Sequence, residues 1–279
     1  ELAVRTGATL KWFDLDSEGR ILSNTADEVI TERTKIVAVT HVGNTTGAIT
    51  DIAPMVKRAH EVGAVVVLDA CQSVPHLKID LHALDVDFAA WSAHKMYGPT
   101  GVGFLYGKRD MLEALPPANF GGSMVELAWM DQEAQYMAPP ARFEAGTQPV
   151  AQVVAAGVAA EWLMNIGMEN LEAHERVIAG ELLKMGQIDG VRILGPQTNE
   201  QRIGTVAFEI DGVHPHDVGQ FIDAQGIAIR VGHHCAQPVH RHFGVYASNR
   251  ASSGIYNSVE DAQALVEALK KVRPFFGVE

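Results

Sequence analysis

Short apolar runs alternate with a helical pattern of apolar positions in the first part of the chain. Continuous apolar runs rich in β-branched residues are typical of strands buried on both faces of a parallel sheet. We expect a helix over about residues 51–61 and strands at 36–40, 65–68, 88–91 and 102–106. Strands that alternate with helices indicate an α/β fold with a mostly parallel sheet.

The pattern changes after residue 115. Residues 116–149 are irregular and contain two Pro-Pro pairs and a Gly-Gly pair, and irregular stretches of this length are often functional or part of an interface. The segments that follow are an apolar helix over about 150–166, strands at 191–194, 205–210 and 227–231, and a helix over about 258–272. We predict a larger domain over residues 1–165 and a smaller α+β domain over residues 166–279.

Two charged residues follow predicted strands. Asp69 comes directly after the run 65–68, and Lys95 follows the run 88–91. The carboxyl ends of parallel strands are where α/β proteins bind ligands, and only one further αβ unit separates the two residues, so we expect both in the same crevice. Asp69 could simply cap the next helix, and Lys95 could be a surface lysine in a tight turn. Together they favour pyridoxal phosphate, because a lysine can form a Schiff base with its aldehyde and a carboxylate can pair with its protonated ring nitrogen.

Cys235 has three interpretations. A free cysteine is most often a small buried hydrophobe, but the surrounding loop predicts an exposed thiol. Zinc is an alternative, although the spacing of the candidate ligands is irregular: His233, His234, Cys235, His240 and His242. We favour a nucleophile whose thiolate is stabilised by a nearby imidazolium or by Arg230. Cys71 is assigned to packing.

Composition limits the class of protein. The net charge of −12 and the pI near 5.4 argue against nucleic acid or an anionic membrane as a partner, since both need a clustered positive surface. The two cysteines lie far apart in the sequence and fit a reducing compartment. No apolar run approaches the roughly 20 residues of a membrane span. We therefore expect a cytoplasmic protein.

Five segments carry a family resemblance: His41-Val42-Gly43-Asn44, Leu68-Asp69-Ala70-Cys71-Gln72, Ser92-Ala93-His94-Lys95, Phe143-Glu144-Ala145-Gly146-Thr147 and Arg230-Val231-Gly232-His233-His234-Cys235-Ala236. They resemble the Suf-type (group II) cysteine desulfurases, of the class V group of fold-type I pyridoxal-phosphate enzymes. The resemblance covers essentially the whole chain. It implies a fold-type I PLP-transferase: an N-terminally truncated large domain and a smaller α+β domain.

The resemblance assigns roles around the cofactor. It implies that Ser92 and His94 bind the phosphate, that Gln72 donates to the ring hydroxyl, and that Thr147 contacts the phosphate bound by a partner subunit. The active site would then require a homodimer. Asn44, which could otherwise be a turn residue, would reach the cofactor hydroxyl and the substrate carboxylate.

The resemblance also implies a reaction. Arg250, by default a surface charge, would bind the carboxylate of L-cysteine, since a guanidinium suits a carboxylate. Cys235 would take the sulfur as a persulfide, release L-alanine and pass the sulfur to an acceptor protein of the Suf system for iron–sulfur cluster assembly. L-Selenocysteine could enter the same site.

Two alternatives stay open. One is a selenocysteine lyase or another class V enzyme. The other is an incomplete, inactive fragment, because the sequence begins with what is predicted to be the end of a helix at Gly7 and lacks the family's Gly/Thr-rich phosphate loop and its ring-stacking histidine.

Overall fold

The computed structural model describes residues 1–278, and its first sheet has the order β1-β2-β3-β4. Strands β1 (Ile36–Thr40), β2 (Val65–Asp69) and β3 (Phe88–Ser92) are parallel, and β4 (Gly103–Gly107) is antiparallel to β3. The predicted α/β fold with a mostly parallel sheet is confirmed.

The apolar runs form strands whose burial differs between the two faces of the sheet. Val66 and Leu68 of β2 are fully buried, whereas Val65 and Val67 are half-buried, so the expected burial of both faces is complete on only one of them. Helix α3 (Ala53–Glu61) starts with Pro54 in its first turn, where proline is well tolerated, and it packs Met55 and Ala59 into the same core. The observed helix starts two residues later than the predicted helix over 51–61 and ends at the same residue.

The connection between β2 and β3 differs from the expectation. Instead of the helix of an αβ unit, residues 70–87 form a series of turns. Hydrogen bonds from the amides of Val74 and Leu77 to carbonyls four residues back start a helical path. Pro75 lies within this path and cannot donate a backbone hydrogen bond, so the path does not extend into a helix. Turns alone nevertheless carry the chain to a parallel neighbour.

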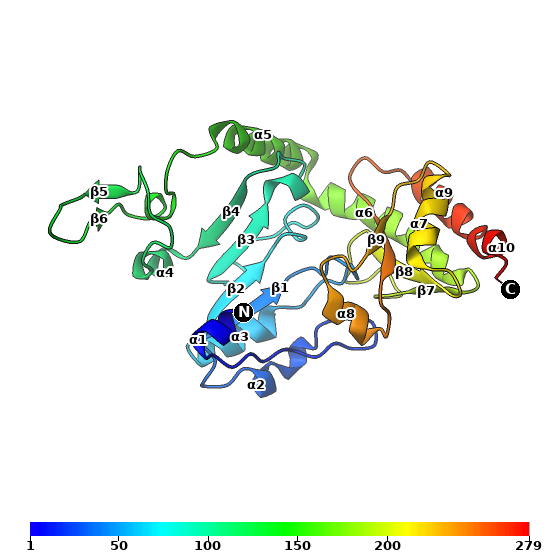
Figure 1. The fold of residues 1–279 in the computed structure, drawn as a ribbon, viewed down its shortest axis with the longest axis horizontal. Helices are drawn as coiled ribbons and strands as arrows, with labels where there is room; N and C mark the ends of the chain where they lie inside the picture. The colour runs from blue at the N-terminus through cyan, green and yellow to red at the C-terminus, as the bar shows by residue number, and fades with distance from the viewer. Residues whose placement is uncertain (279) are drawn as a thin grey trace.

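The second sheet is antiparallel throughout and has the order β7-β8-β10-β9. Its strands are β7 (Val191–Ile193), β8 (Thr205–Ile210), β9 (Arg230–Gly232) and β10 (Ser248–Ser252). The helices that share its core are α6 (Met168–Leu183), α7 (Pro215–Asp223) and α9 (Val259–Leu269). The predicted strand at 227–231 was displaced, since pairing begins at Arg230. The two sheets lie in different parts of the molecule in Figure 1, and the boundary after residue 165 stays a prediction.

The remaining elements lie around the two sheets. They are α1 (Leu2–Thr6), α2 (Ala26–Val29), α4 (Arg109–Ala114), β5 (Val125–Leu127), β6 (Gln135–Tyr136), α5 (Val150–Ile166), α8 (Gln237–His242) and α10 (Val272–Phe276). Helix α1 ends at Gly7 in the left-handed conformation, as the sequence predicts. Figure 1 shows the β5-β6 hairpin at the end of the molecule opposite the C-terminus.

None of the helices formed by residues 1–278 is by itself long and apolar enough to cross a membrane. Helices α5 and α6 together have a suitable length and composition, but the chain bends by 77° between them. Buried residues of α6, such as Ile178 and Leu182, belong to the core of the second sheet.

Candidate active site

Asp69 and Lys95 lie at one edge of the first sheet. Asp69 ends β2 and pairs with Ala90 of β3, while Lys95 ends a short 3-10 helix, η2 (Ala93–Lys95), directly after β3. The Cys71 thiol lies close to both charges. Burial raises the pKa of this thiol and the Asp69 carboxylate raises it further, whereas the positive charge of Lys95 opposes the rise. The expected juxtaposition of the two strand ends is therefore present.

The polar groups at this edge are accessible. Asp69, His94 and Lys95 are exposed, and Gln72 and Ser92 are half-buried. One oxygen of Asp69 accepts a hydrogen bond from the Cys71 amide at 2.9 Å, so the carboxylate fixes a turn instead of capping a helix. Within residues 1–278 the side chains of His94 and Lys95 have no hydrogen-bond partner. These groups are available to a ligand.

A second cluster joins three segments that are far apart in the sequence. Asn44, in the loop after β1, donates from Nδ2 to the carbonyl of His234 at 2.6 Å. Arg250 of β10 donates from Nη1 to the main-chain carbonyl of Asn44 at 2.9 Å. The Cys235 loop and β10 therefore meet at the loop that leaves the first sheet.

Arg250 carries a positive charge close to Cys235. Burial lowers the pKa of Arg250 and the charge of Arg230 adds to this, while Cys235 opposes it. Its Nε is buried and has no hydrogen-bond partner among the described residues. A guanidinium with an unused donor beside an exposed thiol can bind a carboxylate there.

The loop around Cys235 has an unusual backbone. His234 and Cys235 have φ angles of 50° and 59°, a left-handed conformation that residues other than glycine seldom adopt. Ser248 of β10 fixes this loop, because its hydroxyl bonds His234 Nε2 at 3.1 Å and His240 Nε2 at 2.9 Å. Cys235 is therefore exposed, while the preceding His234 is buried. Ser248 was not predicted from the sequence, although it shares a strand face with Arg250 two residues away.

His234 does not supply the imidazolium expected near Cys235. Burial lowers the pKa of His234 to about 4, and the charge of Arg250 adds to the effect. His234 is therefore neutral near pH 7 and is not that imidazolium. Arg250 is a cation close to Cys235, and stabilisation of the thiolate by another imidazolium or by Arg230 stays a prediction. Among residues 1–278 no three His, Cys, Asp or Glu side chains are grouped to hold a metal ion.

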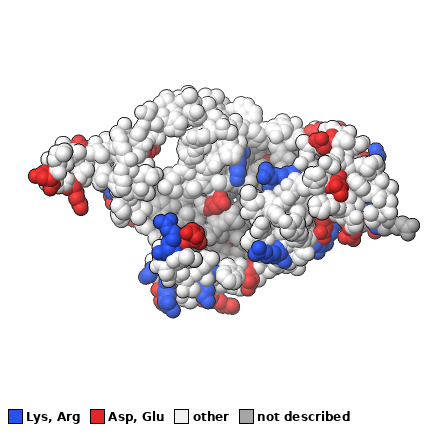
Figure 2. Space-filling model, in the orientation of Figure 1, with Lys and Arg blue, Asp and Glu red and all other residues white. Residues whose placement is uncertain are grey.

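Thr147 lies outside both clusters. It is exposed, precedes α5 and makes no side-chain hydrogen bond within residues 1–278. Its expected contact with a partner's phosphate stays a prediction. Figure 2 shows the middle of one face hollowed, with basic side chains close to an acidic one.

The polar side chains at this edge of the first sheet, those of Asp69, Lys95, Ser92 and His94, match the chemical groups of pyridoxal phosphate. An exposed carboxylate faces solvent next to an amine, with a hydroxyl and an imidazole on the same turn. These correspond to the ring nitrogen, the aldehyde and the phosphate of that cofactor. Cys71, assigned to packing from the sequence, lines the same edge.

Comparison with known proteins identifies the family. Residues 1–265 match the family model "Aminotransferase class-V". The chain belongs to the aminotransferase class-V family. This confirms the family expected from the sequence and its cofactor, since class V aminotransferases and cysteine desulfurases depend on pyridoxal phosphate.

Curated relatives in the class V family are cysteine desulfurases by name. The chain is 49% identical over 280 residues to a probable cysteine desulfurase 2 of Mycobacterium leprae and 47% identical over 277 residues to a probable cysteine desulfurase of Streptomyces coelicolor. These matches cover 100% and 99% of this chain. The chain spans 66% of the length of each of these relatives.

A solved class V structure shares the fold. The crystal structure of the cysteine desulfurase CsdA from Escherichia coli matches with a TM-score of 0.93 and 35% sequence identity. The match covers 98% of this chain and 68% of that one. The same TM-score, at 32% identity, relates this chain to the apo structure of a cysteine desulfurase from Thermococcus onnurineus, of which it also covers 68%.

Proposed function

We propose that this chain carries the active site of a pyridoxal-phosphate-dependent cysteine desulfurase of the Suf type. The observation that carries the proposal is the arrangement of two clusters: Asp69 beside Lys95, and Arg250 beside Cys235, with Asn44 binding to the second. The names of the curated relatives support the same activity. The substrate is L-cysteine and the product L-alanine.

Five residues at the sheet edge and one in the partner subunit would hold the cofactor. Lys95 would bind its aldehyde, Asp69 would pair with its ring nitrogen, Ser92 and His94 would bind its phosphate, and Gln72 would donate to its ring hydroxyl. Thr147 would contribute a phosphate donor across a homodimer. When bound, pyridoxal phosphate supplies an electron sink for the carbon next to the amino group of the substrate.

The other residues act on the substrate. Arg250 and Asn44 hold the carboxylate, and Lys95 Nζ removes the proton from the α-carbon. The Cys235 thiolate attacks the substrate sulfur. A sulfur–sulfur bond forms, the bond between Cβ and sulfur breaks with its electron pair left on carbon, and protonation of Cβ together with return of a proton to the α-carbon gives L-alanine. The positive charge of Arg250 lies close to Cys235.

The persulfide on Cys235 would then pass to an acceptor protein of the Suf system for iron–sulfur cluster assembly. Cys235 is exposed, so an acceptor thiol can reach it. The exposed apolar side chains of α5 support the homodimer, and the two free cysteines fit a cytoplasmic enzyme. L-Selenocysteine fits the same carboxylate and amine contacts.

The two cysteines of the chain allow a direct test. Cys235→Ser should stop alanine formation from L-cysteine, because no thiolate remains to take the sulfur. Cys71→Ser should keep activity within about tenfold, since burial and Asp69 hold the Cys71 thiol protonated. Peptide mass mapping after turnover should find the extra sulfur on Cys235. Equal desulfuration by Cys235→Ser and by the unsubstituted protein would contradict the proposal and favour a selenocysteine lyase or another class V reaction. An unsubstituted protein that binds the cofactor without any turnover would favour an inactive chain.

A further inference from the structure

Arg202 is a buried guanidinium without a carboxylate partner among residues 1–278. It donates to the carbonyls of Pro196 and Thr205, both at 2.5 Å, to that of Ile203 at 3.3 Å and to that of Thr46 at 3.5 Å. Burial lowers the pKa of Arg202 to about 10, so it keeps its charge near neutral pH. A buried charge persists only where hydrogen bonds replace its hydration, and here four main-chain carbonyls do so.

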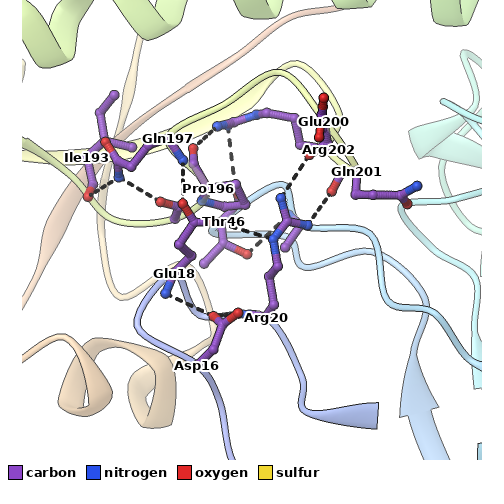
Figure 3. A network of polar contacts seen from close by, with 12 residues as sticks. Asp16, Glu18, Arg20, Thr46, Ile193, Pro196, Gln197, Glu200, Gln201 and Arg202 are labelled. Atoms are coloured by element: carbon purple, nitrogen blue, oxygen red, sulfur yellow. Dashed lines mark hydrogen bonds and ion pairs between the residues drawn. The ribbon is translucent and has the colours of Figure 1, made fainter. Parts of the chain in front are cut away.

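These carbonyls join the loop after β1 to the second sheet. The amide of Ile49 donates to Gln201 and the amide of Ile203 donates to Gly47, both at 2.9 Å, and Ala48 pairs with Arg202 in an antiparallel bridge. Figure 3 shows the Arg202 side chain reaching Pro196 and Thr46. The guanidinium therefore fixes the loop where it crosses the start of β8.

The loop held in this way is the one that carries Asn44. Asn44 lies two residues before Thr46, accepts from Arg250 through its carbonyl and donates to the Cys235 loop through its side chain. We propose that Arg202 is a positioning residue, which acts through the Thr46 carbonyl to hold Asn44 where Arg250 is aimed beside Cys235. The inference deepens the proposed function and rests on it for the identity of the substrate.

A substitution of Arg202 can affect binding of the substrate carboxylate without affecting binding of the cofactor. Asp69 ends β2 and Lys95 follows β3, and within residues 1–278 neither strand forms a hydrogen bond with Arg202 or with its carbonyl partners. Loss of Arg202 should therefore disturb the carboxylate contact and leave cofactor binding intact. A residue that only stabilises the fold would affect both.

Arg20 provides a matched control. Its guanidinium donates to the carbonyls of Gln201 and Glu200, both at 2.8 Å, so it binds the same segment from the N-terminal side (Figure 3). It makes no hydrogen bond to residue 46. Arg20→Met removes a guanidinium that binds main-chain carbonyls of the same segment but forms no hydrogen bond with Thr46.

The first measurement is steady-state kinetics of the cofactor-loaded protein with L-cysteine. Arg202→Met should raise KM by about tenfold while kcat changes less than about threefold and cofactor affinity less than about twofold. Arg20→Met should leave KM within about twofold. Arg202→Lys keeps the charge but loses the planar fork, so it should resemble Arg202→Met and it carries the test if the Met variant does not fold.

The second measurement does not need turnover. Iodoacetate carries a carboxylate that Arg250 attracts toward Cys235, whereas iodoacetamide is neutral, so the ratio of their alkylation rates at Cys235, followed by peptide mapping, reports the placement of Arg250. Arg250→Met gives the ratio in the absence of that guanidinium. The ratio in folded Arg202→Met or Arg202→Lys should fall toward this value, and in Arg20→Met it should stay near that of the unsubstituted protein.

An unchanged KM and alkylation ratio in the folded Arg202 variants would overturn the proposal, as would equal losses in kcat, KM and cofactor affinity. If the unsubstituted protein does not turn over L-cysteine, the proposed function fails. The alkylation ratio then decides the role of Arg202 alone.

Discussion

At the scale of single residues, Lys95 is the group on which the proposed chemistry depends most. It is an exposed amine that follows the end of β3, the neighbouring strand β2 ends with the carboxylate of Asp69, and only a primary amine can form a Schiff base with an aldehyde. Its sequence context already suggested this, because the apolar run before it predicted a strand end. What the sequence did not show is that the Cys71 thiol lies close to both charges.

Lys95→Ala should remove the visible absorbance band of the bound cofactor and lower turnover at least about a hundredfold, since the same amine also moves the α-proton. Borohydride reduction of the unsubstituted protein should label the peptide that contains Lys95. Lys57→Ala is the control, because Lys57 is 80% exposed on α3 and forms only a 4.0 Å ion pair with Glu61. A label on another lysine would contradict the assignment.

The burial of His234 predicts how the free energy of unfolding depends on pH. Its pKa is lowered in the folded protein from 6.5 to about 4, so the unfolded chain takes up a proton on acidification before the folded one does. This contribution to stability is present above pH 6.5 and is lost as the pH falls to about 4. Between pH 7 and pH 5 the loss amounts to about 2 kcal/mol.

Urea unfolding at both pH values measures this loss. His234→Gln should lose about 2 kcal/mol less of its unfolding free energy between pH 7 and pH 5 than the unsubstituted protein does. His216→Gln, at a position 64% exposed on α7, should behave like the unsubstituted protein. The same loss in all three proteins would mean that folding does not lower the pKa of His234.

At the scale of elements, the hydrophobic pattern predicted the strands where burial and pairing coincide. Strand β8 matches its predicted range, and five of its six residues are buried. The run 227–231 was different, because Ile227 and Ile229 pack against the core while only Arg230 and the two residues after it pair. Apolar spacing reports burial, and a segment can be buried without joining a ladder.

The loop after β1 could not be predicted in this way. Its structure depends on close approach of main chains, which leaves no periodic pattern in the sequence. Gly47 has a φ angle of 71°, and a Cβ at this position would lie 2.4 Å from the carbonyl oxygen of Thr205. A side chain there would push the loop away from β8.

Gly47→Ala should therefore destabilise the protein by about 3 kcal/mol or more, from backbone strain together with the clash. Gly63→Ala is the control, since Gly63 has a φ angle of 72° and nothing within 4 Å of the added Cβ. It should cost only the strain, about 1 to 2 kcal/mol. Equal losses in urea unfolding would show that the loop yields without cost.

At the scale of the whole molecule, the candidate site depends on contacts between distant segments. Asn44 and Arg250 are 206 positions apart, and Asn44 and His234 are 190 apart. Single motifs suggested Asn44, Cys235 and Arg250, and the family resemblance placed them in one site. Composition and spacing could not show that the histidine directly before Cys235 is buried and neutral. That property depends on burial, which follows only from the folded chain.

The outer face of α5 is the remaining feature at this scale. Val150, Val154 and Val158 are 63%, 63% and 61% exposed, and their spacing of four places them on one face of the helix. Figure 2 shows no charged side chain over this helix. An exposed apolar face of this kind marks an interaction site, and Thr147 lies directly before it, so a homodimer through α5 would bring Thr147 to the interface.

A charge on this face should separate the subunits. Val154→Asp combined with Val158→Asp would bury carboxylates in the interface, so sedimentation should show a monomer where the unsubstituted protein is a dimer. Val177→Asp is the control, because Val177 is 56% exposed and belongs to α6, outside the apolar face of α5. If Thr147 of the partner donates to the phosphate, the monomer should also bind pyridoxal phosphate about tenfold or more weakly, the cost of one hydrogen bond to a charged group. Thr147→Val should reproduce the weaker binding without changing the sedimentation of the dimer. A monomer that binds the cofactor as tightly as the dimer would remove Thr147 from the site and leave Ser92 and His94 as its proposed phosphate donors.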